Sequence, residues 1–305
     1  MMKKTKIILL LLCAGVLALS LSGCTSDSYR EKKELNATDL SDLRLDFGSA
    51  EVSVRSTEED PYVELYVRES GLRYGGKTSL DIYQSGGHTE LSLSEGNWFF
   101  LMGSKDTKVT LYLPQDAVQT LYARLGSGKF TLTGLNFDSV TGNLSSGDMI
   151  FDNVKAKNVD FTVSSGDLTL RGIEAETAKL NLSSGEIEAG FTGAETKLES
   201  EVSSGEMEVS GNFTQVNAEN KSGETSISSG LLPDSIVADV RSGEINLFVP
   251  QTQEGFTVRY STTSGYFKTD FVRDYDQEDG TLTVGEGISI FDFHISSGEI
   301  SLKKN

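Results

Sequence analysis

Six acidic residues stand at nearly constant intervals, each directly after a Ser-Gly pair, and a row of carboxylates could hold cations. A Ser-Gly pair recurs in the repeat pattern eight times from Ser127 to Gly265, at spacings of 18 to 22 residues, and again at Ser297-Gly298. Ca²⁺ favours carboxylate oxygens, whereas a solvated acidic edge without ions would oppose association between chains. The glycine-rich calcium nonapeptide is absent, so we expect no bound metal. The six acids are Asp148, Asp167, Glu186, Glu206, Glu224 and Glu244.

The residues around each Ser-Gly pair alternate between apolar and polar, which is the pattern of a β-strand. Around Gly128 the apolar positions are Leu121, Leu125, Phe130 and Leu132, and the same positions are apolar in most other copies. Each repeat is therefore predicted to be a strand, a Ser-Gly-acid turn, a second strand and a longer return. The acid after each glycine then faces solvent, and the six acids form a column along one edge.

A repeat of about 19 residues with two short strands cannot close a core of its own, so neighbouring repeats must stack. The sequence thus predicts an all-β protein, a β-solenoid or parallel β-helix, with right-handed coiling by analogy with crossover connections. An antiparallel meander, with hairpins at the Ser-Gly turns, is the alternative. Residues 43–54 fit the template with Ala50 in the glycine position. The repeat domain is expected over residues 40–305, with an irregular β-rich segment at about 56–115.

The first residues of the chain have the pattern of an export signal. Lys3, Lys4 and Lys6 precede an apolar stretch at residues 7–21, which ends close to Cys24. Fifteen apolar residues are short for a membrane span and typical of a secretory signal. The segment resembles the bacterial lipobox. This resemblance implies that residues 1–23 are a lipoprotein signal peptide, that Cys24 carries lipid, and that the protein is extracytoplasmic and membrane-anchored. Polar residues 24–39 are expected to form a tether.

Composition excludes several classes of function. The formal net charge is −18, so the chain lacks the basic surface that a nucleic-acid partner requires. The two cysteines and two histidines lack the spacing of a zinc or iron–sulfur framework. His88 lies in a glycine-rich turn, and His294 should point outward from the last strand. No catalytic residue and no cofactor is predicted, and the protein is not expected to be an enzyme.

Two further segments could bind ligands. Residues 71–78 match the phosphate-binding pattern GxxxxGK[ST], but the alternation after them is that of a strand, where a phosphate loop requires a helix. We interpret them as a β-turn. Residues 98–102 are apolar without interruption, which indicates either a cap over the N-terminal end of the solenoid or a binding loop for a partner, a glycan or a membrane. That loop would present Trp98, Phe99 and Phe100.

The lipobox, the start FGSAEVSV at residues 47–54 and the repeated SSGD and SSGE turns together resemble the bacterial putative-adhesin family of β-strand-repeat surface lipoproteins. The resemblance covers residues 40–302 and supplies no catalytic residues. It implies a β-helix-like fold and a role as a non-catalytic adhesin or cell-envelope scaffold, with an envelope protein or a polysaccharide as partner. The alternatives are an envelope-stress sensor or accessory protein and, less favoured, a β-helix enzyme that acts on polysaccharides.

Overall fold

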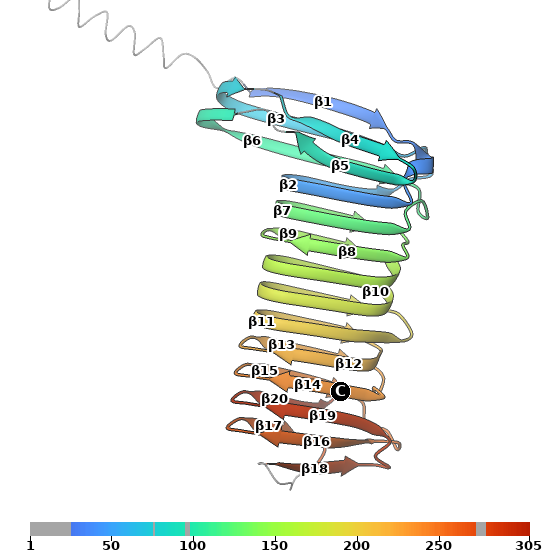
Figure 1. Ribbon diagram of the computed structural model, residues 1–305, viewed down its shortest axis with the longest axis vertical. Coiled ribbons are helices and arrows are strands. Elements are labelled where there is room, and N and C mark those ends of the chain that lie inside the picture. Colours follow the sequence, from blue (N-terminus) through green and yellow to red (C-terminus); the bar gives the residue numbers. More distant parts are fainter. Residues whose placement is uncertain (1–25, 76, 95–97, 273–278) are drawn as a thin grey trace, which may run out of the picture.

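Each regular coil consists of two strands joined at a Ser-Gly turn, and the coils stack into a tall column (Figure 1). The computed structural model describes residues 26–75, 77–94, 98–272 and 279–305. Within these residues the only helix is the short 3₁₀ helix η1 (Ala37–Asp39). The prediction of an all-β protein is confirmed.

Equivalent residues of successive coils lie side by side in two parallel ladders. On the first strand of the coil, Leu121 of β7 lies beside Val140 of β8, which lies beside Val159 of β10. On the second strand, Phe130 of β7 lies beside Met149 of β9. Parallel pairing between repeats is the arrangement of a solenoid, and it excludes the antiparallel meander for these coils. The strands of this region are β7 (Thr120–Thr133), β8 (Ser139–Leu144), β9 (Asp148–Asp152), β10 (Lys155–Phe191), β11 (Thr196–Gly211), β12 (Phe213–Asn220), β13 (Glu224–Ser229), β14 (Ser235–Val240) and β15 (Glu244–Val249).

The core lies between the two ladders and is almost entirely apolar. Rings from neighbouring coils contact one another, with centroids 5.5 Å apart for Phe130 and Phe151 and 4.9 Å apart for Phe151 and Phe161. Asn220 is one of the buried polar residues, and it stands where most other copies have leucine or valine. Its amide donates to the Thr225 hydroxyl at 3.1 Å, so the two polar residues that depart from the repeat pattern satisfy each other.

The turns bring the glycines of neighbouring coils into close contact. Gly185 has a φ of +106°, and a Cβ placed there would lie 2.3 Å from the carbonyl oxygen of Gly166. Gly166 itself has no positive φ, yet a Cβ on it would lie 2.4 Å from the carbonyl oxygen of Gly147. Close stacking therefore requires glycine at these turns, whether or not the backbone is left-handed.

The coils at the C-terminal end do not stack in chain order. β19 (Ser289–Ile295) and β20 (Glu299–Lys304) lie between the β14–β15 coil and the coil of β16 (Phe256–Thr262) and β17 (Tyr266–Thr269). The ninth Ser-Gly copy is thus a neighbour of the seventh, as Figure 1 shows. β18 (Asp279–Val284) pairs antiparallel with β16 and forms the end of the stack. The outer coil has Thr262 and Thr269 where most inner coils have apolar residues, which suits an end position.

At the N-terminal end, β2 (Asp42–Ser56) continues both ladders of β7. Ala50 pairs with Gly128, so the template recognised in residues 43–54 is confirmed. The irregular segment is a β-rich insertion made largely of antiparallel pairs, β3 with β6 and β4 with β5. β5 and β6 also extend the two parallel ladders beyond β2. The strands of the insertion are β3 (Tyr62–Gly75), β4 (Ser79–Ser85), β5 (His88–Ser94) and β6 (Trp98–Leu113).

The prediction of a polar tether at residues 24–39 was wrong for most of that range. Residues 26–34 form β1 (Ser26–Glu34), which pairs antiparallel with β3 along its whole length. The physical reason is that β3 would otherwise present an open edge with unpaired backbone groups. Lys32 lies 3.7 Å from the centre of the Tyr62 ring, so even a highly charged strand gains cation–π contacts there.

Candidate binding surfaces

The register of the second ladder aligns the six acids into one column. Asp148 pairs with Asp167, and from Glu186 onward each glutamate pairs with the next as far as Glu244. Five of the six are exposed and Glu244 is half-buried. Among the described residues no ion pair involves any of the six, although Lys129 lies beside Asp148 in the ladder and the Asn246 amide donates a hydrogen bond to Glu244 at 2.7 Å.

The β19–β20 coil, which lies between the β14–β15 coil and the β16–β17 coil, adds a seventh acid to this column. Glu299 pairs with Glu244 on one side and with Tyr266 on the other. Burial acts to raise the pKa of Glu299, but hydrogen bonds from Lys268 at 2.5 Å and Ser301 at 2.9 Å, with the positive charge of Lys268, lower it overall. The Ser-Gly-acid motif of the ninth copy signalled this residue, but its place in the column follows only from the order of the coils.

A shallow polar groove of about 810 Å³ runs along the turns at the C-terminal end of the column. Its sides are the serine hydroxyls of successive turns, the glycine backbone and the acids Glu206, Glu224, Glu244 and Glu299. Tyr266 lies at its end and is 59% exposed. No group of three or more His, Cys, Asp or Glu among the described residues is arranged to hold a metal ion. We call this surface the turn groove.

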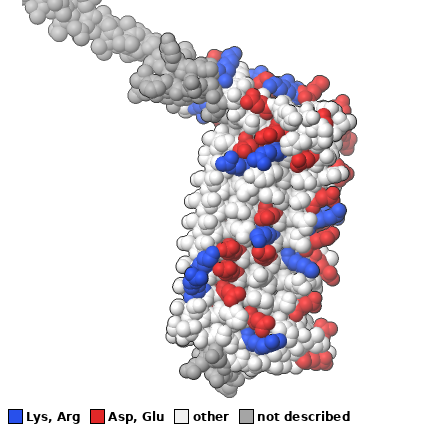
Figure 2. Space-filling view, viewed as in Figure 1, with Lys and Arg blue, Asp and Glu red and all other residues white. Residues whose placement is uncertain are grey.

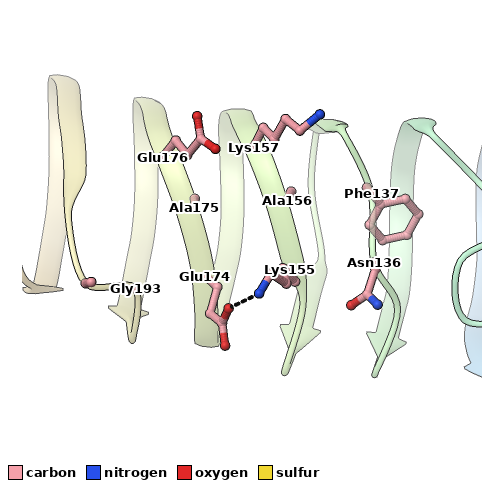
Figure 3. Close-up of a pocket in the computed structure, with 10 residues that line it drawn as sticks. Asn136, Phe137, Lys155, Ala156, Lys157, Glu174, Ala175, Glu176 and Gly193 are labelled. Atoms are coloured by element: carbon pink, nitrogen blue, oxygen red, sulfur yellow. Dashed lines mark ion pairs between the residues drawn. The ribbon is translucent and has the colours of Figure 1, made fainter.

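A second, apolar groove of about 450 Å³ lies along the edge of the stack where the chain passes from one coil to the next, which we call the return edge (Figure 3). Ala156 and Ala175 lie at its centre, with Phe137 at one end, and the Lys155–Glu174 ion pair of 2.8 Å crosses one side. Lys157, on the other side, pairs with Asp138 at 2.7 Å. The hydrogen bonds to Glu174 and Asp138, followed by the charges of these partners, raise the pKa values of Lys155 and Lys157. The sequence analysis did not predict this groove. A signal for it was present, because Ala156 and Ala175 stand at the repeat position that Phe137 occupies in an earlier coil.

The outer face of the first ladder carries ion pairs between neighbouring coils. Lys179 contacts Glu199 at 2.5 Å, and Lys221 contacts Glu201. Figure 2 shows basic and acidic side chains next to one another on the visible face of the coils. This pairing distinguishes the outer face from the acidic column, where like charges stand in register.

The two histidines lie at opposite ends of the stack. His88 Nδ1 is 2.8 Å from Asp42, and His294, exposed as alternation predicts, has Nδ1 3.2 Å from the Ser261 hydroxyl. The inserted coil also brings Asp239 beside His294 in the ladder. Within the described residues no hydrogen bond or ion pair joins Asp239 to His294, so this row has neither the contacts nor the burial of a Ser-His-Asp triad.

Other residues singled out by the sequence can be placed only in part. Cys24 lies outside the described residues. The backbone of Trp98, Phe99 and Phe100 begins β6 and pairs with the end of β3, while their side chains lie outside the described part. The phosphate-loop motif is followed by strand β4, where phosphate binding would need a helix. No helix among the described residues is long and apolar enough to cross a membrane.

Comparison with solved structures identifies the fold. A putative adhesin from Parabacteroides distasonis superposes with a TM-score of 0.59 at 12% identity, covering 90% of this chain and 97% of that chain. A putative adhesin from Parabacteroides merdae gives 0.58 at 14% identity, with 90% and 96% covered. A putative lipid binding protein from Parabacteroides distasonis gives 0.56 at 18% identity, with the same coverage. At these identities the likeness is one of fold.

Comparison with sequences is decisive for the family. A search of curated proteins found no match. The model of the Toastrack DUF4097 family matches residues 40–303, which is the region predicted from the repeats and observed as the stacked ladders. The resemblance to putative adhesins agrees with this match. The chain belongs to the Toastrack DUF4097 family.

Proposed function

We propose that this chain is a lipid-anchored, extracytoplasmic protein that binds an extended cell-envelope partner without catalysing a reaction, as an adhesin or a scaffold does. The observation that carries the proposal is the register of the second ladder, which repeats one set of side chains at every coil, about 4.8 Å apart. A surface that repeats itself suits a partner that repeats itself. Right-handed coiling of repeats of about 19 residues is part of the same proposal.

The turn groove is the surface we assign to this partner. Carboxylates and serine hydroxyls accept hydrogen bonds, and a polysaccharide offers a hydroxyl donor at each sugar. Tyr266 adds an exposed ring at the end of the groove, where an apolar sugar face can pack. A neutral or amine-bearing envelope polysaccharide fits this lining, whereas an anionic polymer would be repelled by the column.

Co-sedimentation of the mature chain with insoluble envelope polysaccharide tests this assignment. The Glu206→Gln/Glu224→Gln variant should bind at least about thirtyfold more weakly, because two charged acceptors at about 1 kcal/mol or more each are lost. The matched control, Glu174→Gln/Glu199→Gln, removes two ion-paired glutamates outside the groove and should bind like the parent. Equal loss in both variants would reject the groove, and release of soluble sugars would reject a non-catalytic role.

The anchor is tested separately by cell fractionation. The Cys24→Ser variant should appear in the soluble or secreted fraction, because the site of lipid attachment is gone. If Cys24→Ser stays with the membrane and keeps an uncut N-terminus, residues 7–21 serve as a membrane helix and the lipid proposal is wrong. This outcome would not affect the test of polysaccharide binding, which uses chains without lipid.

A further inference from the structure

The outer face of the first ladder contains a polar cleft of about 320 Å³ near the C-terminal end of the stack. The cleft is lined by the ends of β12, β14 and β19, which neighbour one another in the ladder, and by the residues directly after them. It shares no residue with the turn groove, so it is a separate surface. One of its sides is β19, so the cleft is a product of the inserted coil.

The cleft gathers residues that depart from the repeat. Two residues before the turn glycine, four successive coils from Ser145 to Ser203 have serine, whereas the next two coils have Lys221 and Arg241. The coil that introduces Lys221 also has Asn220 where most other coils have an apolar residue. Residues that stacking requires recur from coil to coil, so departures that gather in one place indicate a function other than stacking.

Asn220 fixes the backbone that carries these residues. Its side-chain amide donates to the carbonyl oxygens of Gly223 and Glu244, each at 2.9 Å, and its side-chain oxygen accepts from the Gly223 amide at 2.8 Å. One side chain therefore joins the turn of its own coil to the next coil. The backbone amide of Arg241 also donates to the Asn220 carbonyl oxygen at 2.9 Å. Lys221 and Arg241 are thus presented by a rigid part of the stack, as a binding site requires.

The charged side chains of the cleft are only partly occupied by one another. Lys221 contacts Glu201 and lies 3.9 Å from Glu219. Among the described residues, however, the side chains of Asp239 and Arg241 form no ion pair or hydrogen bond. Asp239 is half-buried and Arg241 is exposed, and both line the cleft. A carboxylate and a guanidinium are therefore both available to a ligand, two residues apart in the chain.

We propose that this cleft binds a small zwitterion, an α-amino acid or a short peptide, with its carboxylate on Arg241 and its ammonium group on Asp239. Arginine suits a carboxylate because its guanidinium donates two parallel hydrogen bonds. A ligand of one sign is disfavoured, since the cleft sets the acids Glu219 and Asp239 against the bases Lys221 and Arg241. Such a ligand would be attracted by one pair and repelled by the other, whereas a zwitterion is attracted by both.

The chain supplies its own reporter, because His294 lines the cleft and His88, the only other histidine, lies at the opposite end of the stack. NMR signals of the two imidazole rings are followed in residues 25–305 while L-alanine, dialanine, propionate or ethylamine is added. Alanine or dialanine should shift the His294 signals and leave those of His88 unchanged. Propionate lacks the ammonium group and ethylamine lacks the carboxylate, so each should bind at least about tenfold more weakly. The tighter of the two zwitterions identifies an amino acid or a peptide as the source.

Two variants and a control assign the binding to the cleft. Arg241→Gln and Asp239→Asn should each weaken binding of the zwitterion at least about tenfold, because each removes one charged partner. The matched control, Arg124→Gln, removes an arginine of the same ladder that contacts Asp46, and it should bind like the parent. Unchanged His88 signals confirm that each variant keeps its fold.

Three results would overturn the proposal. They are a His294 ring that neither zwitterion shifts, propionate or ethylamine binding as tightly as the zwitterions, and an equal loss in Arg241→Gln and in Arg124→Gln. Because the cleft and the turn groove share no residue, failure of polysaccharide binding would leave this result unaffected.

Discussion

At the scale of single residues, the Ser-Gly turn needs glycine for two separate reasons. Gly185 combines a φ of +106° with a backbone contact from Gly166 that leaves no room for a Cβ. The sequence suggested only the first reason, because a turn implies a positive φ. The second reason arises from stacking, since each turn lies directly against the turn of the neighbouring coil.

Gly185→Ala should therefore lower the free energy of unfolding by about 1–3 kcal/mol, from backbone strain and the clash with Gly166. Gly190→Ala is the matched control, because its φ is not positive and a Cβ there would have its nearest neighbour at 3.8 Å. It should be neutral or slightly stabilising. Urea unfolding measures both variants, and an equal effect of the two would contradict the stacking argument.

Glu299 should make stability depend on pH. Its pKa in the folded protein is lowered from 4.5, so its contribution is present above that value and is lost as the pH falls through the folded pKa. Lys268→Gln removes the main cation partner and leaves burial to act in the opposite direction. The difference in urea midpoint between the parent and Lys268→Gln should shrink from about pH 6 to about pH 3. A constant difference over that range would refute the coupling.

At the scale of the elements, the column of like charges across β9, β10, β11, β13 and β15 should make stability sensitive to salt. Sodium chloride should raise the melting temperature, because a screening length of about 10 Å at 0.1 M weakens repulsion between coils. Calcium at matched ionic strength should give the same rise, since the described acids form no metal-binding group. A larger rise with calcium, abolished in Glu186→Gln/Glu206→Gln, would instead identify a cation site.

The parallel ladders could be predicted because alternation around each Ser-Gly pair repeats from coil to coil, as with Leu121 and Val140. The order of the last coils could not, since Val258 and Phe291 are both apolar at the same repeat position and either suits a place beside Ile236. The return-edge groove was equally hidden. Periodicity counts Ala156 as core, whereas the groove depends on how small that side chain is.

At the scale of the whole molecule, an antiparallel strand lies over each end of the solenoid, although among the described residues β17 has no strand on its outer side. β1 covers β3 at one end, and β18 covers β16 at the other. Open ends of a parallel stack would pair with other chains. The inserted β19–β20 coil lies between other coils and not at an end, so losing it should affect the molecule differently from losing an end.

A chain that lacks residues 289–305 should associate or unfold, because β14, β15, β16 and β17 all lose partner strands. Size-exclusion chromatography and thermal unfolding measure the two effects. If the coils were stacked in chain order, this deletion would remove only the outermost coil and leave a stable monomer with a slightly lower melting temperature. That result would overturn the observed order of the coils.

The inserted coil also constrains the order in which the protein acquires its structure during synthesis. Coils from β2 to β15 can be added one by one as the chain emerges. β17, however, pairs only with β20, which follows it by about thirty residues, and β16 has only β18 until β19 arrives. The last strands must enter between coils that precede them, so a chain interrupted before β19 leaves its stack open. The stack can therefore be completed only after β20 has been synthesised.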